Sequence, residues 1–363
     1  MWNATVISKL AAVIFHFRTQ CTDEETEPLE VRSMNPNETL TAVGRLKVGH
    51  AETAGGRSGC TVILPDGGAV AGVDIRGGAP GTCGTESLNP INLVDRVHGL
   101  FFSGGSAFGI ATADGVRRFL KERSIGFATE YGVVPTVAGA VIFDLGINKG
   151  GPTPDAALGL EACLKAHAGP VEQGCVGAGC GATIGKLYGL SQATKGGLGS
   201  SLIRTERNVR VGALVVVNPF GDVVDPHSGR ILAGCRESAQ SRRFVHTAQA
   251  MARLERLRGF SANGNTVLAA VATNVRLTKT DLTKVAQMAH DGLARVVVPC
   301  HTQVDGDTIF ALSLEERDPV DVSIVGMLAA QAVEKAILRA VLSARARGGL
   351  PAARDLLDDL PEP

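Results

Sequence analysis

Apolar runs of two kinds alternate along most of the chain. Short runs rich in Val, Ile and Ala, bounded by glycine and proline, predict buried strands, and they lie at residues 60–64, 69–75, 140–145, 211–218, 266–275, 296–298 and 308–312. Longer stretches with apolar residues every three or four positions predict helices, at about residues 110–123, 153–168, 278–294 and 321–347. A strand, a glycine turn and a helix recur in this order, which predicts an α/β fold built of packed layers.

The connections between these elements carry two further predictions. The turn Pro-Asp-Gly-Gly at residues 65–68 separates the first two strands and predicts that they form a hairpin. Residues 236–263 are charged and predict a helical stretch that ends in a flexible linker at Ser261–Gly264. A buried strand follows this linker directly. We therefore expect residues 266–363 to form a strand, helix, strand, strand, helix unit behind an exposed linker.

The composition narrows the class of partner. Lys plus Arg and Asp plus Glu number 36 each among 363 residues, and no basic stripe with interleaved aromatic residues occurs. The electrostatic footprint of a nucleic-acid-binding protein is therefore missing. No segment approaches the roughly 20 apolar residues that a membrane helix needs. We expect a small peptide or amide as partner, with no nucleic acid and no membrane.

The cysteines and the N-terminal residues bear on location and domain organisation. The eight cysteines include no C-x-x-C pair and lie mostly in apolar or Gly/Ala-rich surroundings, which favours reduced thiols in the cytoplasm. An early apolar run is only six residues long and lacks a small-x-small cleavage site, so a signal peptide is disfavoured. We expect residues 1–42 to be a flexible extension and residues 43–363 to be a single domain.

The junction Gly264-Asn265-Thr266 is the candidate reactive segment, because a polar linker runs there directly into a strand that opens with threonine. The Thr266 hydroxyl on a strained turn can attack the preceding carbonyl through a five-membered ring, and water can hydrolyse the resulting ester. The freed α-amino group, with an ordinary pKa of about 7.7–8.0, can then act as the base for its own hydroxyl. The alternative for this local sequence is a plain turn that enters a strand.

Six separated stretches bear on the same question. They follow one another in the chain as Asp74–Thr82, Ser103–Gly109, Gly139–Asp144, Val215–Pro219, Gly264–Thr273 and His301–Thr308. Together they resemble the DmpA-type aminopeptidase family, which includes β-peptidyl aminopeptidases and 6-aminohexanoate (nylon) oligomer hydrolases, over about residues 43–345. The resemblance implies a four-layer αββα sandwich like that of N-terminal-nucleophile hydrolases. It also implies self-cleavage into an α chain, residues 1–265, and a β chain, residues 266–363, with homo-oligomers of the cleaved pairs.

The resemblance also implies roles for individual residues. Thr266 is the nucleophile, and Asn218, at the end of its strand, matches the asparagine beside the nucleophile, whose amide N–H can hold a developing oxyanion. Lys186 matches a lysine of the nylon-oligomer branch, and a cation there keeps a nearby α-amine neutral and basic. Asp305 and Asp307 match the pair that orients the amine and hydroxyl of the nucleophile. Without the resemblance, the alternatives are a turn cap for Asn218, a surface lysine for Lys186 and a plain turn for the two aspartates. A divalent-ion site is disfavoured, because the oxygen-rich loop of a calcium site does not continue.

One position departs from the family pattern. Many members have Tyr where this chain has Phe143, so a phenolic hydroxyl that could donate to the oxyanion or the substrate is absent. This departure weakens the case for the aminopeptidase activity of the Tyr-bearing members. Another donor, such as a backbone N–H, is then needed to complete the oxyanion hole.

No motif indicates a cofactor or a metal. Several histidines are scattered without the spacing of a metal site and are interpreted as structural or surface residues: His50, His98, His227, His290 and His301. The glycine-rich segment 177–186 fails the Walker A pattern at Cys180, and residues 104–108 lack the final glycine of a serine-hydrolase elbow.

These observations predict a cofactor-independent hydrolase of small peptide or amide bonds that uses Thr266 through an acyl-enzyme. Two alternatives stay open at this point: an acyltransferase of the ornithine acetyltransferase kind, and an uncleaved binding protein of the same fold. The sequence does not select among α-peptides, β-peptides, D-residue amides and nylon-type oligomers.

Overall fold

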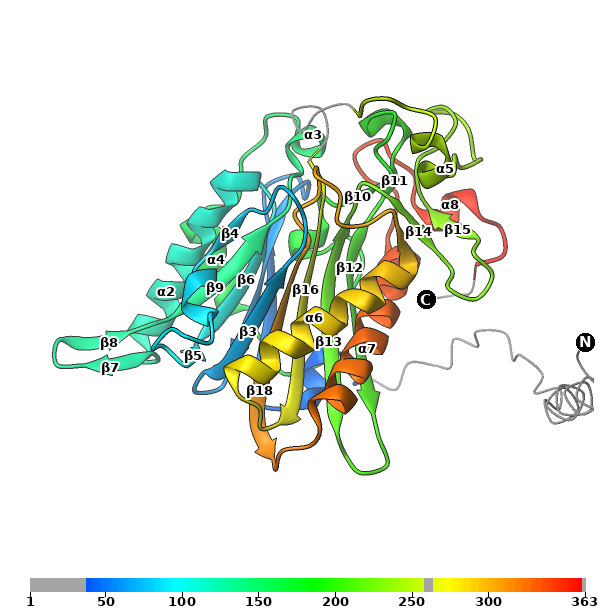
Figure 1. Ribbon diagram of the computed structural model, residues 1–363. Coiled ribbons are helices and arrows are strands. Elements are labelled where there is room, and N and C mark those ends of the chain that lie inside the picture. The colour runs from blue at the N-terminus through cyan, green and yellow to red at the C-terminus, as the bar shows by residue number, and fades with distance from the viewer. Residues whose placement is uncertain (1–36, 258–263, 361–363) are drawn as a thin grey trace, which may run out of the picture. The chain divides into compact units, whose positions relative to one another are not determined.

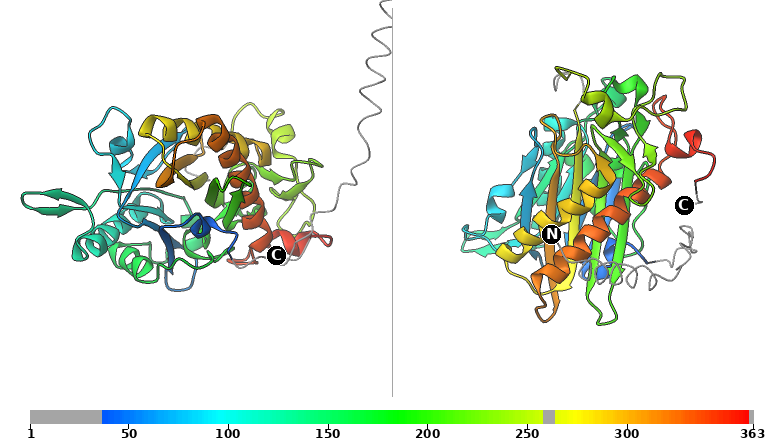
Figure 2. Two further views of the ribbon diagram at one scale, coloured as in Figure 1. Left: turned by 90° about the horizontal axis from the view of Figure 1, so that it is seen from below. Right: turned by 45° about the vertical axis from the view of Figure 1, so that its right-hand side comes forward.

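The strand and helix patterns form a layered arrangement in the computed structural model, which describes residues 37–257 and 264–360 (Figure 1). Two sheets lie face to face, and a pair of helices covers the outer face of each (Figures 1 and 2). The expected α/β class and the αββα order of layers are thus confirmed. The described residues cluster as one compact unit.

The five-stranded sheet contains strands from the first part of the chain. Its order is β1 (Leu46–Glu52), β2 (Gly59–Pro65), β6 (Gly99–Ser103), β9 (Val137–Val141) and β4 (Thr82–Cys83). The β6–β9 pair is parallel, and the other pairs are antiparallel.

The six-stranded sheet carries the candidate reactive segment. Its order is β12 (Gly197–Arg204), β13 (Arg210–Asn218), β16 (Thr266–Val275), β18 (Thr308–Arg317), β3 (Ala69–Ile75) and β5 (Arg96–Val97). Only β16 and β18 pair in parallel. All ten residues of β16 are buried, because the strand has a neighbour on each side and a covered layer on each face.

The helices pack in pairs on the two outer faces. On the five-stranded sheet these are α2 (Thr112–Glu122) and α4 (Ala156–Leu164), and on the six-stranded sheet they are α6 (Lys279–Val296) and α7 (Val322–Ser343). Helix α6 begins at a capping box, in which the Thr278 side chain accepts from Asp281 N–H and the Asp281 carboxylate accepts from Thr278 N–H. Helix α7 begins at Asp321, whose side chain accepts from Ser323 N–H.

Short elements complete the described fold. They are α3 (Leu145–Asn148), α5 (Thr247–Met251), α8 (Ala353–Leu356), β7 (Phe127–Thr129), β8 (Gly132–Val134), β10 (Thr183–Ile184), β11 (Thr194–Lys195), β14 (Asp222–Val224), β15 (Ile231–Ala233) and β17 (Val297–Val298).

Strand alternation divides the apolar residues of the six-stranded sheet between two cores. Leu214, Leu268 and Phe310 face the other sheet, where the Phe310 ring lies 6.0 Å from that of Phe102. The intervening residues, such as Val215 and Ala269, join the core under α6 and α7. Each fully buried Val, Leu or Phe side chain contributes roughly 1.5–3 kcal/mol to stability, so both faces of the sheet hold the strand ends in place.

Two local predictions need correction. The expected hairpin of residues 60–75 does not form, because β2 belongs to the five-stranded sheet and β3 to the six-stranded sheet. The Gly67 and Gly68 turn, with positive φ at both residues, instead carries the chain from one layer to the other. The expected helical stretch at 236–263 is helical only at Thr247–Met251 within the described residues, and residues 258–263 lie outside them.

The N-terminal boundary also falls earlier than expected. Residues 1–36 of the predicted extension lie outside the described residues. Leu40–Val43, however, is a buried 3-10 helix packed against β12 and β13, and Leu40 N–H donates to Ser200 Oγ at 2.8 Å. Residues 40–42 are therefore part of the folded domain. Among the described helices, none is long and apolar enough to cross a membrane.

Candidate active site

Strand register brings the predicted nucleophile and the predicted oxyanion donor together. Thr266 is the first residue of β16 and Asn218 is the last of β13, and the two are direct partners in the antiparallel ladder. Both side chains are buried, at 4% and 0% exposure. These two residues, 48 positions apart in the chain, therefore lie side by side at one end of the sheet. Strand β18 starts at the same end.

The peptide bond between Asn265 and Thr266 is held from two sides. Gly306 N–H donates to the Asn265 carbonyl oxygen at 2.9 Å, and the Thr266 hydroxyl donates to the same oxygen. A methyl group on Gly306 would lie 2.8 Å from Thr266 Oγ1, so a larger residue there would press on the hydroxyl. The carbonyl is thus polarised by a backbone donor while the hydroxyl stands next to it.

The side-chain amide of Asn218 has two different environments. Its oxygen accepts from Lys186, and its nitrogen has no hydrogen-bond partner among the described residues. Lys186 Nζ donates to Asn218 Oδ1 at 3.0 Å and to Asn218 O at 3.1 Å, and it also donates to Thr183 O at 2.8 Å. Thr183 N–H donates to the same Asn218 Oδ1 at 2.9 Å. With Oδ1 fixed in this way, the buried Asn218 Nδ2 has no hydrogen-bond partner within residues 37–257 and 264–360. It is a ready donor for an oxyanion.

Lys186 is not the surface lysine that local sequence allowed. Its side chain is 2% exposed, and burial lowers its pKa from the ordinary 10.5 to about 7. The negative charge of Asp305 acts in the opposite direction, while Lys195 lowers the pKa further. At neutral pH the amine therefore exists in both protonation states.

The two aspartates are held by backbone donors. Asp305 Oδ1 accepts from Phe220 N–H at 3.0 Å, and its Oδ2 accepts from Thr302 N–H at 3.1 Å. Burial, and next the charge of Asp307, raise the pKa of Asp305 above its usual range. Asp307 Oδ1 accepts from Val267 N–H at 2.7 Å, directly after the predicted nucleophile. The structure thus places both carboxylates beside the Asn265–Thr266 segment.

Three features of this site were not predicted from the sequence. Thr183 supports Asn218 and Lys186, and His301, expected to be structural or superficial, lies against Asp307 with its Nδ1 2.8 Å from Oδ2. Gly77 packs so tightly that a methyl group there would lie 2.3 Å from Asp307 N. Two of them carried a sequence signal: His301 opens the stretch His301–Thr308 that contains both aspartates, and Gly77 lies in the stretch Asp74–Thr82.

Phe143, the position of departure from the family pattern, also lies at this site. A methyl group on Gly264 would lie 2.1 Å from Phe143 Cγ, so the phenyl ring packs directly on the residue two positions before Thr266.

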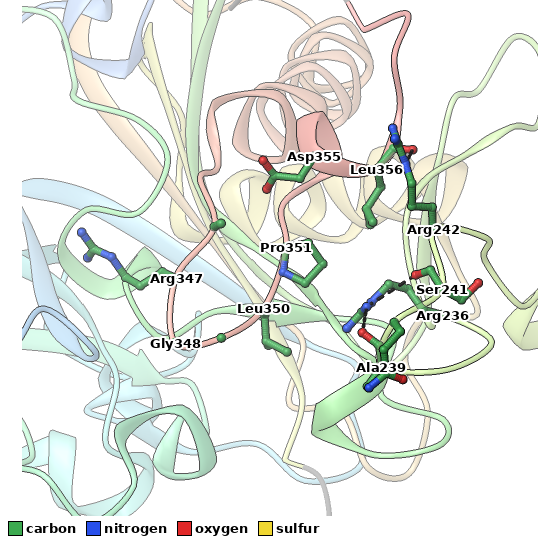
Figure 3. Close-up of a pocket in the computed structure, with 13 residues that line it drawn as sticks. Arg236, Ala239, Ser241, Arg242, Arg347, Gly348, Leu350, Pro351, Asp355 and Leu356 are labelled. Atoms are coloured by element: carbon green, nitrogen blue, oxygen red, sulfur yellow. Dashed lines mark hydrogen bonds between the residues drawn. The ribbon is translucent and has the colours of Figure 1, made fainter.

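A separate surface pocket of about 610 Å³ lies elsewhere (Figure 3). It lies between residues 236–242 and 346–356, and none of the five predicted catalytic residues lines it. Arg236 at its wall donates to the main-chain carbonyls of Ala239 and Ser241. Within the described residues no group of three or more His, Cys, Asp or Glu side chains is arranged to hold a metal ion.

Comparisons with known proteins agree with the family resemblance. The model of peptidase family S58 matches residues 38–353. A Mycobacterium tuberculosis (strain ATCC 25618 / H37Rv) protein described as an uncharacterized aminopeptidase is 40% identical over 345 residues, covering 88% of this chain and 97% of that protein. The 6-aminohexanoate-oligomer endohydrolase of Kocuria sp. (strain KY2) is 32% identical over 308 residues, covering 81% of this chain and 83% of that protein.

Solved structures give the same fold. A Burkholderia sp. beta-aminopeptidase superposes with a TM-score of 0.64 at 22% identity, covering 88% of this chain and 92% of its own. The L-aminopeptidase D-Ala-esterase/amidase of Ochrobactrum anthropi, described as a variant of the Ntn hydrolase fold, gives 0.63 at 20% identity, covering 87% and 89%. On the match of its sequence over residues 38–353, the chain belongs to peptidase family S58 and is a hydrolase that acts on peptide or amide bonds.

Proposed function

We propose that the chain cleaves itself between Asn265 and Thr266, and that the freed Thr266 then hydrolyses peptide or amide bonds through an acyl-enzyme. One observation carries the proposal. The carbonyl oxygen of Asn265 accepts from Gly306 N–H while the Thr266 hydroxyl lies against it, so the bond to be broken and its attacking group are held together.

The cleavage step follows from this arrangement. Thr266 Oγ1 attacks the carbonyl carbon of Asn265, and the developing oxyanion stays on the oxygen that Gly306 N–H already holds. The C–N bond then breaks, the Thr266 nitrogen takes the proton that Oγ1 releases, and an ester links Asn265 to the threonine oxygen. Water hydrolyses the ester, which leaves a carboxylate on Asn265 and a free α-amine on Thr266.

The same residue then acts on substrate. The α-amine takes the hydroxyl proton as Oγ1 attacks the substrate carbonyl, and the proton passes to the departing amine. Asn218 Nδ2, buried beside Thr266 and without a partner among the described residues, donates to the oxyanion of the tetrahedral intermediate. Water enters the acyl-enzyme by the reverse sequence and regenerates Thr266.

Lys186 and the aspartates prepare these groups. Lys186 fixes the Asn218 amide through Oδ1, and its positive charge, when present, disfavours protonation of the nearby α-amine. The Asp307 carboxylate accepts a hydrogen bond from Val267 N–H. The Asp305 carboxylate accepts one from Thr302 N–H, within the loop that also contains Gly306. The relatives' names, aminopeptidase and 6-aminohexanoate-oligomer endohydrolase, support a peptide or amide bond as target, and membership of a peptidase family favours hydrolysis over the acyltransferase alternative.

Intact mass spectrometry of the purified full chain tests the proposal. We expect two fragments that correspond to residues 1–265 and 266–363, a single uncleaved species for Thr266→Ala, and retained cleavage for Thr266→Ser, which keeps a hydroxyl. Hydrolysis of aminoacyl p-nitroanilides and of 6-aminohexanoate oligomers is then expected only in cleaved samples. A well-folded wild-type chain that stays intact on prolonged incubation, or cleavage of Thr266→Ala at the same bond, would refute the mechanism.

A further inference from the structure

His301 contacts the centre described above in an unusual way. Its backbone N–H donates to Asp307 Oδ2 at 3.0 Å, and its ring Nδ1 lies 2.8 Å from the same oxygen. Both donors of one residue thus converge on one carboxylate oxygen. The other oxygen of Asp307 accepts from Val267 N–H at 2.7 Å, so the carboxylate links His301 to the residue that follows the nucleophile.

This convergence depends on a rare backbone conformation. His301 has φ of +55°, in the left-handed region that residues with a side chain seldom adopt. Such conformations persist where the surrounding contacts require them, and they cluster at functional sites. Here the conformation turns the backbone N–H and the ring of His301 toward the same acceptor.

The surroundings favour a charged imidazolium at this position. Burial opposes protonation, but the hydrogen bond and charge of Asp307, together with Cys300, outweigh it and raise the pKa of His301 to about 9. The ring meets that of His290 on α6 edge-on, with centroids 4.8 Å apart. Burial lowers the pKa of His290 to about 4, so the imidazolium faces a neutral ring.

His290 also contacts Asp74 on β3. His290 Nε2 lies 3.1 Å from Asp74 O and 3.5 Å from Asp74 Oδ2, and the Arg76 guanidinium pairs with the same carboxylate at 2.7 Å. The titratable and charged groups around His301 are therefore Asp307 and Cys300 from its own loop, His290 from α6, Asp74 from β3, and Arg76 just beyond the end of β3. Among them only Asp307 forms an ion pair with the His301 ring.

We propose that His301 is a positioning residue of the catalytic centre: as an imidazolium it fixes the Asp307 carboxylate against Val267 N–H and thereby sets the position of Thr266. The inference rests on the proposed function for its kinetic consequence. His301 acts through Asp307 on the start of β16, and substrate is not its partner. Its loss therefore affects the rate of reaction more than the binding of substrate.

Three variants separate the ring from the backbone. His301→Gly keeps the left-handed conformation and removes the ring, while His301→Asn tolerates that conformation and offers an amide donor that does not titrate. His98→Asn is the matched control, because the ring Nδ1 of His98 also takes part in a hydrogen bond, in which it accepts from Thr136 N–H at 3.2 Å, away from the site.

At pH 8 we expect His301→Gly to lower both the rate of self-cleavage and kcat by about tenfold to hundredfold, as misplacement of a reacting group does. KM should change by less than about threefold, since binding contacts are kept. His301→Asn should recover only part of the loss, because its amide donates to Asp307 without a positive charge, and it should lack the fall in kcat above pH 9 that wild type shows when the His301 ring loses its charge. His98→Asn should stay within about twofold of wild type, as for a substitution away from the site.

The proposal is overturned if His301→Gly keeps wild-type rates, if it loses no more than His98→Asn, or if His301→Asn keeps the alkaline fall. A second measurement stands apart from catalysis: titration of the His301 ring by NMR in the intact Thr266→Ala chain. Protonation that persists to about pH 9 and drops in an Asp307→Asn variant supports the pair even if the wild type does not cleave itself. A ring that titrates near its ordinary pKa of about 6.5 refutes it.

Discussion

Lys186 offers a sharp test of the electrostatics of the site, because its amine is buried and donates hydrogen bonds to oxygens of Thr183 and Asn218. Its pKa falls from 10.5 in water to about 7 in the fold. Between these values the unfolded chain binds one proton more than the folded chain. Folding stability from this group therefore rises with pH, by about 1.4 kcal/mol per unit at 25 °C.

The perturbation is Lys186→Met, which keeps the length of the side chain and removes the titrating amine. Relative to the parent chain, the variant should lose about 1.4 kcal/mol of stability for each pH unit between 7.5 and 9.5, or roughly 3 kcal/mol in all. The acceptors of the lost amine, Thr183 O and Asn218 Oδ1, add an offset of about 1–3 kcal/mol each. That offset is the same at every pH, so the slope is the observable.

Urea unfolding followed by far-UV circular dichroism provides the assay, with parent and variant both in a Thr266→Ala background so that each remains one chain. Groups common to both chains cancel in the difference. Lys121→Met, an exposed lysine on α2, is the matched control and should give stability curves parallel to those of the parent. If the Lys186→Met difference is constant within about 0.5 kcal/mol across the range, the amine is not buried as described and the reasoning fails.

Three further substitutions probe the neighbouring contacts. Asn218→Ala removes the proposed oxyanion donor and should lower kcat by about 10²–10³-fold with little change in KM. A kcat within tenfold of wild type would count against that role. Gly77→Ala places a methyl group 2.3 Å from Asp307 N and should cost about 1–3 kcal/mol in urea unfolding. Gly264→Ala places a methyl group 2.1 Å from Phe143 Cγ and should slow self-cleavage, measured on denaturing gels. The double variant Gly264→Ala/Phe143→Ala should cleave faster than Gly264→Ala alone. Equal cleavage rates in the single and double variants would contradict the contact.

The apolar periodicity of the sequence predicted most helices and strands correctly, but the sequence predicted wrongly how some of them are connected. The strands at 211–218 and 266–275 and the helix at 321–347 were predicted because their apolar residues recur at the spacing of one buried face or of a fully covered strand. The turn at 65–68 was equally clear, yet it joins two layers and not two paired strands. A tight turn fixes the direction of the chain locally, while the sheet that a strand joins depends on partners far away in sequence.

For the site, the sequence supplied the residue types and tertiary structure supplied their contacts. Motif resemblance named Thr266, Asn218 and Lys186, but only the β13–β16 register shows Asn218 directly opposite Thr266. The burial of Lys186 had no signal in local sequence, and the place of His301 in the stretch His301–Thr308 gave no indication of its contact with Asp307. The burial of a side chain and its contacts cannot be inferred from the type of that residue, because they depend on which layers of the fold pack around it.

By itself the sequence therefore determined the alternation of strands and helices, the membership of a peptidase family and the position of a threonine at the head of a buried strand. These properties follow from spacing and residue type along the chain. Only the tertiary structure decided that the ends of β13 and β16 meet, that the Lys186 amine is buried away from water, and that the His301 ring pairs with the Asp307 carboxylate. The physical reason is that register, desolvation and hydrogen-bond geometry arise between residues distant in sequence.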